Sequence, residues 1–361
     1  MIVTMRIISI LNQKGGVGKT TTTINLGAGL TRKNRKVLLI DLDPQGNIAT
    51  CFNDSSQKDM YDFLIDNADI QECIRNLGTN FDMITCKESL IRAEAQMLGM
   101  ENKETLLRRK LRGSEHIKNY DYVLIDCPPS IGLLSQNAIL ASSEVIIPVG
   151  CDFLSYKGLR TIVDLINYIS DRYDHEIAIS KIVPTMYDAR SALCVEILNQ
   201  MSNDFYELVA DPIRVSSKIK ESPKHGQSIF KYDLKCTGAE DYLKLVNQVI
   251  YDERKYKIEE KEDAEDLSDT ENAQRHKISL KTPLKSNSKA IRESIGIFTK
   301  PSAKTVRALK AAAKRSKKGK GSKSTLKFKA KSKLKVKGAV KVTKFYKIKN
   351  NVGRRAAYVS Y

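Results

Sequence analysis

Three features are scarce in this sequence of 361 residues: pairable cysteine motifs, long apolar runs and, over the last part of the chain, acidic side chains. The seven cysteines are odd in number and none has the Cys-x-x-Cys spacing, which argues against a disulfide framework and against a zinc knuckle. No apolar run approaches the roughly 18 residues that a membrane-spanning helix needs. We therefore expect no stable membrane insertion and no secreted, disulfide-stabilised fold, and the cysteines suit a reducing cytoplasm.

The shortage of acids is confined to one end of the chain. Residues 273–361 contain 28 Lys and Arg but only one acid, Glu293, whereas the whole chain has a formal net charge of +19. The stretch before them, Lys257–Glu271, contains eight acids and two lysines. Neither composition buries enough apolar surface to offset the entropy lost on ordering. The predicted organisation is a folded domain at 1–255, an acidic linker at 256–272 and a lysine-rich, disordered tail at 273–361.

The predicted domain alternates strand-like and helix-like segments. Short runs rich in Ile, Val and Leu end at Asp, Gly, Pro or Asn, and each is followed by a longer stretch of helical period. The runs VLLI at 37–40 and YVLI at 122–125 are apolar at successive positions, as expected for strands covered on both faces. The pattern predicts an α/β fold with a mostly parallel twisted sheet and helices on both faces. The predicted strands are Arg6–Asn12, Lys36–Asp43, Asp121–Pro128, Glu144–Gly150 and Ile177–Pro184, with a weaker one at Phe81–Cys86, and the predicted helices lie near 18–33, 88–112, 132–141, 156–173, 189–202 and 238–253.

The strongest local motif lies between the first predicted strand and the first predicted helix. Its sequence, KGGVGKTT, follows the phosphate-binding pattern GxxxxGK[ST], except that Gln13 replaces the first glycine and Lys14 adds a second lysine. Glycines allow backbone N–H groups to approach phosphate oxygens, with the N-terminus of the helix behind them. Lys19 is expected to contact the β- and γ-phosphates, and the Thr20 hydroxyl to bind Mg²⁺. The predicted nucleotide-binding residues are Lys14, Gly15, Gly16, Val17, Gly18, Lys19, Thr20 and Thr21.

Three aspartates follow predicted buried strands, at the sheet edge where open α/β sheets bind their ligands. Asp41 and Asp43 end one strand, and Asp126 ends another. One carboxylate at such a place holds Mg²⁺ through its waters, and a second positions or deprotonates an attacking water. An aspartate at the end of a strand is also often only the N-cap of the next helix, so the assignment depends on the neighbouring phosphate loop. The predicted metal-binding residues are Thr20, Asp41 and Asp126.

Together, Lys14, the DLDPQGN run at 41–47 and the IDCPPS run at 125–130 resemble the ParA/Soj partition ATPases within the larger MinD-like group. The resemblance spans about residues 1–253. It implies a P-loop NTPase switch in which two subunits sandwich ATP, Lys14 contacts the partner's phosphates and Asp43 orients the hydrolytic water. The catalytic residues implied are Lys14, Lys19 and Asp43, and the cofactors implied are ATP and Mg²⁺.

A basic segment near the end of the predicted domain is similar to the part of these ATPases that binds DNA without reading its sequence. It contains Arg214, Lys218, Lys220 and Lys224 and only one acid, Glu221. Lysine at 218, where many members have arginine, keeps the charge that a phosphate contact needs. An ordinary solvated loop is the alternative for these four residues.

The lysine-rich tail is not explained by the resemblance. Its charge predicts binding to nucleic-acid backbones by counterion release, and the alternate lysines from Lys327 to Lys337 have the period of a β-strand. A solubilising tail, an address for transport and a segment masked by the acidic stretch are alternatives.

We therefore expect a cytoplasmic, nucleoid-associated ATPase that forms a homodimer with ATP and binds DNA nonspecifically. The resemblance implies that it partitions plasmid or chromosomal DNA and is stimulated by a ParB-like, centromere-bound partner. A histone-like DNA-compacting protein dominated by the tail and a MinD-like membrane-associated positioning ATPase are the alternatives. DNA binding that is independent of nucleotide would favour the first, and a lipid-binding amphipathic helix would favour the second.

Overall fold

The computed structural model describes residues 5–55, 57–266, 328–331 and 345–348. The strands of its main sheet are β1 (Arg6–Ile10), β2 (Val37–Asp41), β3 (Arg75–Gly78), β4 (Phe81–Ile84), β5 (Tyr122–Asp126), β6 (Glu144–Gly150) and β7 (Ala178–Thr185). They lie in the order β3-β4-β2-β5-β1-β6-β7, and every neighbouring pair is parallel except β3 and β4. The predicted mostly parallel sheet is confirmed.

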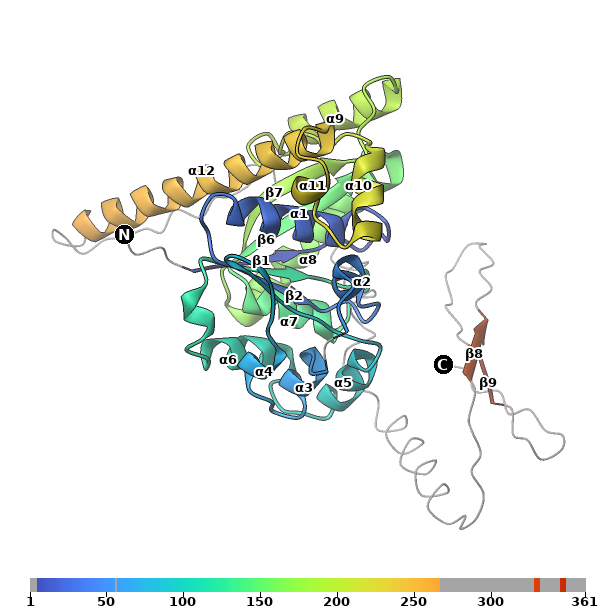
Figure 1. The fold of residues 1–361 in the computed structure, drawn as a ribbon, viewed down its shortest axis with the longest axis vertical. Coiled ribbons are helices and arrows are strands. Elements are labelled where there is room, and N and C mark those ends of the chain that lie inside the picture. Colours follow the sequence, from blue (N-terminus) through green and yellow to red (C-terminus); the bar gives the residue numbers. More distant parts are fainter. Residues whose placement is uncertain (1–4, 56, 267–327, 332–344, 349–361) are drawn as a thin grey trace, which may run out of the picture. The chain divides into compact units, whose positions relative to one another are not determined.

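Helices cover both faces of this sheet (Figure 1). Over one face lie α1 (Lys19–Thr31), α11 (Ile229–Tyr232) and α12 (Thr237–Asp266), and over the other lie α7 (Leu133–Ala141) and α8 (Phe153–Tyr173), with α6 (Leu106–Arg112) beside α7. β2, β5 and β6 are buried along their whole length, as strands with two covered faces must be. The shorter helices are α2 (Asn47–Phe52), α3 (Met60–Leu64), α4 (Ile70–Cys73), α5 (Leu90–Met97), α9 (Ala192–Asp204) and α10 (Ser217–Glu221), and single 3₁₀ turns lie at Lys103–Thr105, Ile117–Asn119 and Ser222–His225.

The register of the sheet brings the predicted aspartates together. Asp126 at the end of β5 is the partner of Ile10 on β1 and of Asp41 on β2. The loop that follows β1 therefore begins beside both carboxylates. This edge of the sheet is formed by the carboxyl ends of parallel strands, where the sequence predicts the ligand site.

Three elements differ from their prediction. The helix expected at 88–112 is interrupted, because Asn102 has a left-handed backbone (φ +49°) between α5 and α6. β3 was not predicted, since its four residues RNLG alternate between half-buried and exposed at the antiparallel edge of the sheet. α12 continues past its expected end at 253 to Asp266, through part of the acidic stretch, where no glycine or proline interrupts a run rich in Glu and Lys.

The last part of the chain, Arg292–Tyr361, is a second unit, which is described by itself. β8 (Phe328–Lys331) pairs in antiparallel register with β9 (Phe345–Ile348). A strand therefore occurs within the segment whose alternate lysines predicted one. The prediction that the tail is disordered lies otherwise outside the described residues.

Candidate nucleotide-binding site

The loop between β1 and α1 has the backbone that its glycines predict. Gly16 and Gly18 have left-handed backbones (φ +75° and +88°), which residues with a Cβ adopt only with strain. Gly18 is the N-cap of α1 and offers no side-chain cap, so the first N–H groups of a 13-residue helix point into the loop without a protein acceptor there. A Cβ built on Gly15 or Gly16 meets no atom within 4 Å, so the space in front of the loop is open. Such a cradle fits an anion.

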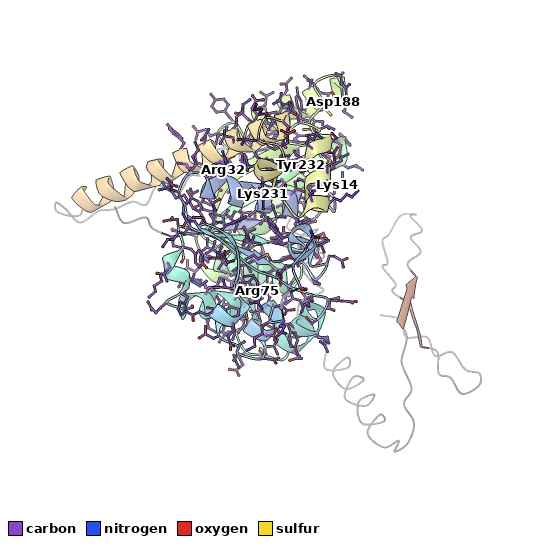
Figure 2. The ribbon with its side chains drawn as sticks, viewed as in Figure 1. Lys14, Arg32, Arg75, Asp188, Lys231 and Tyr232 are labelled. Atoms are coloured by element: carbon purple, nitrogen blue, oxygen red, sulfur yellow. The ribbon has the colours of Figure 1, made fainter. Side chains whose placement is uncertain are left out.

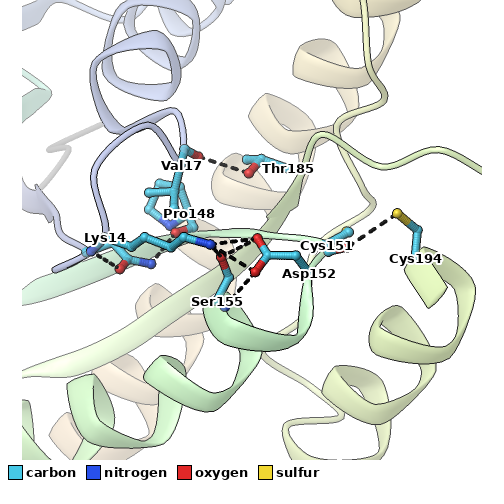
Figure 3. A network of polar contacts seen from close by, with 9 residues as sticks. Lys14, Val17, Pro148, Cys151, Asp152, Ser155, Thr185 and Cys194 are labelled. Atoms are coloured by element: carbon cyan, nitrogen blue, oxygen red, sulfur yellow. Dashed lines mark hydrogen bonds and ion pairs between the residues drawn. The ribbon is translucent and has the colours of Figure 1, made fainter.

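Neighbouring strands fix the loop from behind (Figure 3). The Thr185 hydroxyl at the end of β7 donates to the Val17 carbonyl at 2.9 Å. Asn12 donates to the Pro148 carbonyl on β6 at 2.6 Å and accepts from the Lys14 N–H at 2.9 Å. The loop is thus held in shape by the protein itself, so a ligand does not have to order it.

Lys19 is a buried cation at the start of α1. Lys19 is only 7% exposed, and among the described residues its ammonium makes one long contact, 3.4 Å, to the Lys14 carbonyl. Burial lowers the pKa of Lys19, although the nearby carboxylates of Asp126 and Asp43 favour its charged form. A buried ammonium with so few acceptors suits the phosphate oxygens of a nucleotide.

Thr20 and Asp126 form the most direct contact between two predicted metal-binding residues. The Thr20 hydroxyl donates to Asp126 Oδ2 at 2.6 Å, and the Thr23 hydroxyl lies 3.4 Å from Oδ1. Asp126 is completely buried, and burial raises its pKa to about 7 despite the hydrogen bond from Thr20 and the charge of Lys19. A hydroxyl and a buried carboxylate are hard oxygen donors, so this pair fits Mg²⁺.

Asp41 has a different environment from that expected of an open metal ligand. Its Oδ1 accepts from the Asp43 N–H at 3.0 Å and its Oδ2 from the Ile48 N–H at 3.1 Å, so both oxygens hold the turn that leads into α2. Burial, and then the neighbouring Asp126 carboxylate, raise the pKa of Asp41 well above its usual range. The N-cap of α2 is Gly46 and not Asp41, but the Asp41 carboxylate still serves to hold the start of this helix.

Asp43 is better placed to act on a ligand. It is 7% exposed, and only its Oδ1 accepts a hydrogen bond among the described residues, from the Gln45 N–H at 3.1 Å. Its carbonyl accepts from the Cys86 thiol at 2.7 Å and from the Gly46 N–H at 2.9 Å, which fixes the turn. The second carboxylate oxygen is therefore available for a water molecule near the phosphate loop.

The Lys14 side chain extends toward Asp152 and Ser155 at the start of α8 (Figure 3). Its ammonium lies 2.8 and 2.9 Å from the two carboxylate oxygens of Asp152 and 2.9 Å from the Ser155 hydroxyl. Partial burial opposes the charged form of Asp152, but hydrogen bonds from Lys14 and Ser155 outweigh it and lower its pKa to about 2. Sequence reasoning missed Asp152, whose only local signal is its position as the N-cap of α8, after β6.

The four residues of the predicted DNA-binding segment fall into two groups. Arg214 is bonded to Asp241 at 2.6 Å and to Glu240 at 2.8 Å, and Lys218 lies 3.0 Å from Glu221. Lys220 and Lys224 are exposed and form no ion pair within the part of the chain that the structure describes.

Three further cations lie on neighbouring elements and were not predicted. Lys231 on α11, Lys235 after it and Arg32 at the end of α1 are exposed, and none pairs with a described carboxylate. Figure 2 shows Arg32 and Lys231 close together over α1 and α11. Their positions follow from the packing of α1 against α11, which sequence spacing does not reveal.

Among the helices that the structure describes, none combines the length and the apolar character that a membrane-spanning helix requires.

A family described as an AAA domain matches residues 5–179. The sporulation initiation inhibitor protein Soj of Bacillus subtilis is 37% identical over 249 residues, which make up 68% of this chain and 98% of that protein. A Borrelia burgdorferi protein assigned to plasmid partition, solved with AMPPNP, is similar with a TM-score of 0.60 at 26% identity over 69% of this chain and 100% of that one. Cobyrinic acid a,c-diamide synthase of Mycobacterium smegmatis, solved with ADP and magnesium, has a TM-score of 0.59 at 28% identity over 68% and 94% of the two chains. With the second lysine, the glycine loop and the paired aspartates in place, this chain belongs to the ParA/Soj family of partition ATPases.

Proposed function

We propose that this protein is an ATP-driven switch that partitions DNA. It binds and hydrolyses MgATP, forms a dimer in the ATP state, binds DNA without sequence preference in that state and responds to a ParB-like partner. The observation that supports this most directly is that two lysines of the same loop have different surroundings. Lys19 is buried at the start of α1, whereas Lys14 is part-exposed at the edge of the molecule, where a second subunit can approach.

The chain's own residues divide the chemistry of hydrolysis among them. Lys19 and the N-terminus of α1 hold the phosphates, and Thr20 and Asp126 hold Mg²⁺. Bound Mg²⁺ neutralises charge that develops on the phosphate oxygens. Asp43 orients the attacking water and accepts its proton through the oxygen that makes no hydrogen bond to the described residues.

The edge beside Lys14 has the surface of a dimer interface. Phe153 and Leu154 begin α8, Met186 follows β7 and Leu193 begins α9, and these four apolar side chains are between 48% and 71% exposed. Neighbouring strands β6 and β7 place them at one edge of the sheet. Apolar residues gathered beside a charged group form the usual core and rim of an interface. In the dimer, Lys14 exchanges Asp152 for the phosphates bound by the partner.

DNA binding rests on cations that the fold leaves unpaired. Lys220, Lys224, Lys231, Lys235 and Arg32 meet this condition among the described residues, and they supply contacts to phosphates rather than to bases. Arg214 serves mainly to hold the segment to α12 through Asp241. The lysine-rich tail adds a second, sequence-independent attraction to DNA.

The relatives' names support the biological role. Soj is a chromosome-partitioning ATPase in Treponema pallidum, and ParA is a chromosome-partitioning protein in Caulobacter vibrioides. A ParB-like protein bound at a centromere, a nucleoid location in the cytoplasm and a plasmid or chromosome as cargo follow from this role.

The test is a binding titration of the intact protein with ATP, with ADP and without nucleotide. A nonspecific duplex serves as ligand, and molecular mass is measured for each state. We expect a dimer with ATP and a lower Kd for DNA in that state than with ADP. A protein that stays monomeric with ATP, or that binds DNA equally in all three states, contradicts the proposal.

The charge of the tail favours a second candidate, a DNA-compacting protein whose ATPase domain only regulates it. In that case DNA binding is independent of nucleotide in the intact chain and disappears when residues 273–361 are deleted.

A further inference from the structure

We infer that Asn25 is a positioning residue that couples the nucleotide site to the basic face of the same subunit, an inference that rests on the function proposed above. Asn25 lies in the middle of α1 and is 3% exposed. Its amide donates from Nδ2 to the Thr21 carbonyl at 2.9 Å, in the first turn of α1. Its Oδ1 accepts from the N–H of Ile229, the first residue of α11, at 2.8 Å. One side chain therefore connects the phosphate-binding helix to a second helix.

The bond to Ile229 has no substitute in α11 itself. The first N–H groups of a helix lack an intrahelical acceptor, and Ser228, the N-cap of α11, makes no side-chain cap. A buried N–H that loses its acceptor costs more than an ordinary hydrogen bond contributes. The start of α11 is thus fixed by Asn25, a residue of another helix.

Close packing of side chains also connects α1 to α11. A Cβ built on Gly29 of α1 would lie 2.9 Å from the ring of Phe230 on α11. The guanidinium of Arg32, also on the α1 side, lies 5.8 Å from the centroid of that ring. A movement of α1 is therefore transmitted to α11.

From α11 the contacts continue into the basic segment through Tyr232. Its hydroxyl donates to Glu221 Oε2 at 2.8 Å, and its ring stacks on His225 with the centroids 5.0 Å apart. The Lys218 ammonium lies 5.6 Å from the centroid of the same ring and 3.0 Å from the same carboxylate. Figure 2 shows Tyr232 beside Lys231, on the face that includes Arg32.

The contacts form a continuous path between the two sites. Lys19 and Thr20, in the first turn of α1, hold the nucleotide, and the next residue, Thr21, is bonded to Asn25. A change in that turn on binding the γ-phosphate reaches α11 through Asn25 and α10 through Tyr232. The basic face is then presented in the ATP state, independently of whatever the dimer adds.

The experiment compares full-length wild type, Asn25→Ala and Tyr232→Phe, with Thr22→Val as matched control. Thr22 is also buried on α1, but its hydroxyl faces Tyr242 of α12 at 3.4 Å instead of α11. For each protein, the Kd for a nonspecific duplex is measured with ATP and with ADP, together with ATP affinity, basal turnover and Tm. The quantity compared is the DNA affinity with ATP divided by the DNA affinity with ADP. A loss of protein stability alone leaves this ratio unchanged.

We expect Asn25→Ala to lower this ratio about tenfold, within the range typical of coupling between two sites. Tyr232→Phe lowers it in the same direction by about threefold, because it removes one hydrogen bond at the surface. ATP affinity and basal turnover stay near wild type in both, and Thr22→Val keeps the wild-type ratio.

Unchanged ratios in both variants overturn the inference, as does an equal loss in Thr22→Val, which would indicate general softening of α1. If Asn25→Ala does not fold, Tyr232→Phe decides. A wild-type ratio of one refutes instead the proposed function on which the inference rests.

Discussion

Two buried charges of opposite sign set the behaviour of the site at the scale of single residues. Lys19 and Asp126 are both withdrawn from water, and each favours the charged form of the other against the cost of burial. Among the described residues, the Lys19 ammonium makes one long contact to a carbonyl, whereas both carboxylate oxygens of Asp126 lie within hydrogen-bonding distance of hydroxyls. A phosphate would supply Lys19 with further acceptors and Mg²⁺ would balance the charge of Asp126, so binding of MgATP should stabilise the folded protein.

Lys19→Ala should reduce ATP affinity and turnover by about a hundredfold or more, because the phosphates lose their principal cation. Equilibrium binding of a fluorescent ATP analogue and steady-state phosphate release measure the two quantities. Lys14→Ala is the matched control from the same loop. It should keep ATP binding by the monomer and lose the dimer, so equal losses of ATP affinity in the two variants would contradict the division of roles.

Asp126→Asn should stabilise the ligand-free protein more at pH 8 than at pH 5. The pKa of Asp126 is raised from an unfolded value of about 3.9 to about 7, so between these values the native state binds the extra proton. Stability then falls as pH rises through this window, and asparagine removes the loss. We expect the gain in the free energy of unfolding to be larger at pH 8 than at pH 5 by on the order of 2 kcal/mol.

Urea denaturation at the two pH values measures this gain, with Asp66→Asn, at an exposed position on the same domain, as control. The same Asp126→Asn variant should lose stabilisation by MgATP. A gain that is equal at pH 5 and pH 8 would show that the carboxylate is not titrating in the window.

At the scale of elements, the close packing of α1 decides how the phosphate loop is supported. Gly29 faces Val246 of α12 and Phe230 of α11, with no room for a methyl group. Gly158 on α8 has no atom within 4 Å of a Cβ built on it. The two glycines thus have the same chemistry in opposite surroundings.

Gly29→Ala should lower the free energy of unfolding by about 1–3 kcal/mol, because the new methyl group forces α1 away from its neighbours. Gly158→Ala should raise it by about 0.5–1 kcal/mol, since alanine restricts the unfolded chain and nothing opposes it. Chemical denaturation of both variants gives the comparison. If Gly29→Ala left the free energy of unfolding unchanged, α1 would not be closely packed against α11. The proposed coupling, in which a movement of α1 is transmitted to α11, would then lose its support.

Whether the sequence predicts a feature depends on how far apart along the chain the interacting residues lie. Strands β2 and β5 and the glycine loop rest on local patterns, and they were predicted. The rule that parallel strands share an edge led to Thr20 and Asp126 as predicted ligands of Mg²⁺, and the structure places their side-chain oxygens 2.6 Å apart. Asp152 pairs with Lys14 across 138 positions in the sequence, and no local pattern indicates such a contact. Likewise, the ion pair that ties Arg214 to α12 depends on how two distant segments pack, so the sequence counted that arginine as available.

At the scale of the whole molecule, charge is divided between two parts of the chain. The Bacillus subtilis Soj protein covers 68% of this chain, and the net positive charge comes from the lysine-rich residues 273–361. The matched part has a net negative charge, so the proposed DNA binding by this part depends on the local group of exposed cations around α10, α11 and the end of α1. On the proposed function, DNA binding by the whole protein is the sum of a nucleotide-dependent contribution and a purely electrostatic one.

Deleting residues 273–361 should separate these two contributions. Each phosphate neutralised contributes about −0.9 to the slope of log K against log salt, so a segment with 28 basic residues and one acid should dominate that slope. We expect the intact chain to bind a nonspecific duplex at low salt with ATP and with ADP, and to lose about 10³-fold or more in affinity between 50 and 200 mM salt.

The shortened chain should bind more weakly, show a slope smaller by several units and retain binding only with ATP. Fluorescence anisotropy at the two salt concentrations measures all of these quantities. Equal slopes for the two chains would mean that the lysines of the tail do not contact DNA. Their charge would then have to be neutralised within the molecule, for which the acidic stretch before the tail is the nearest source.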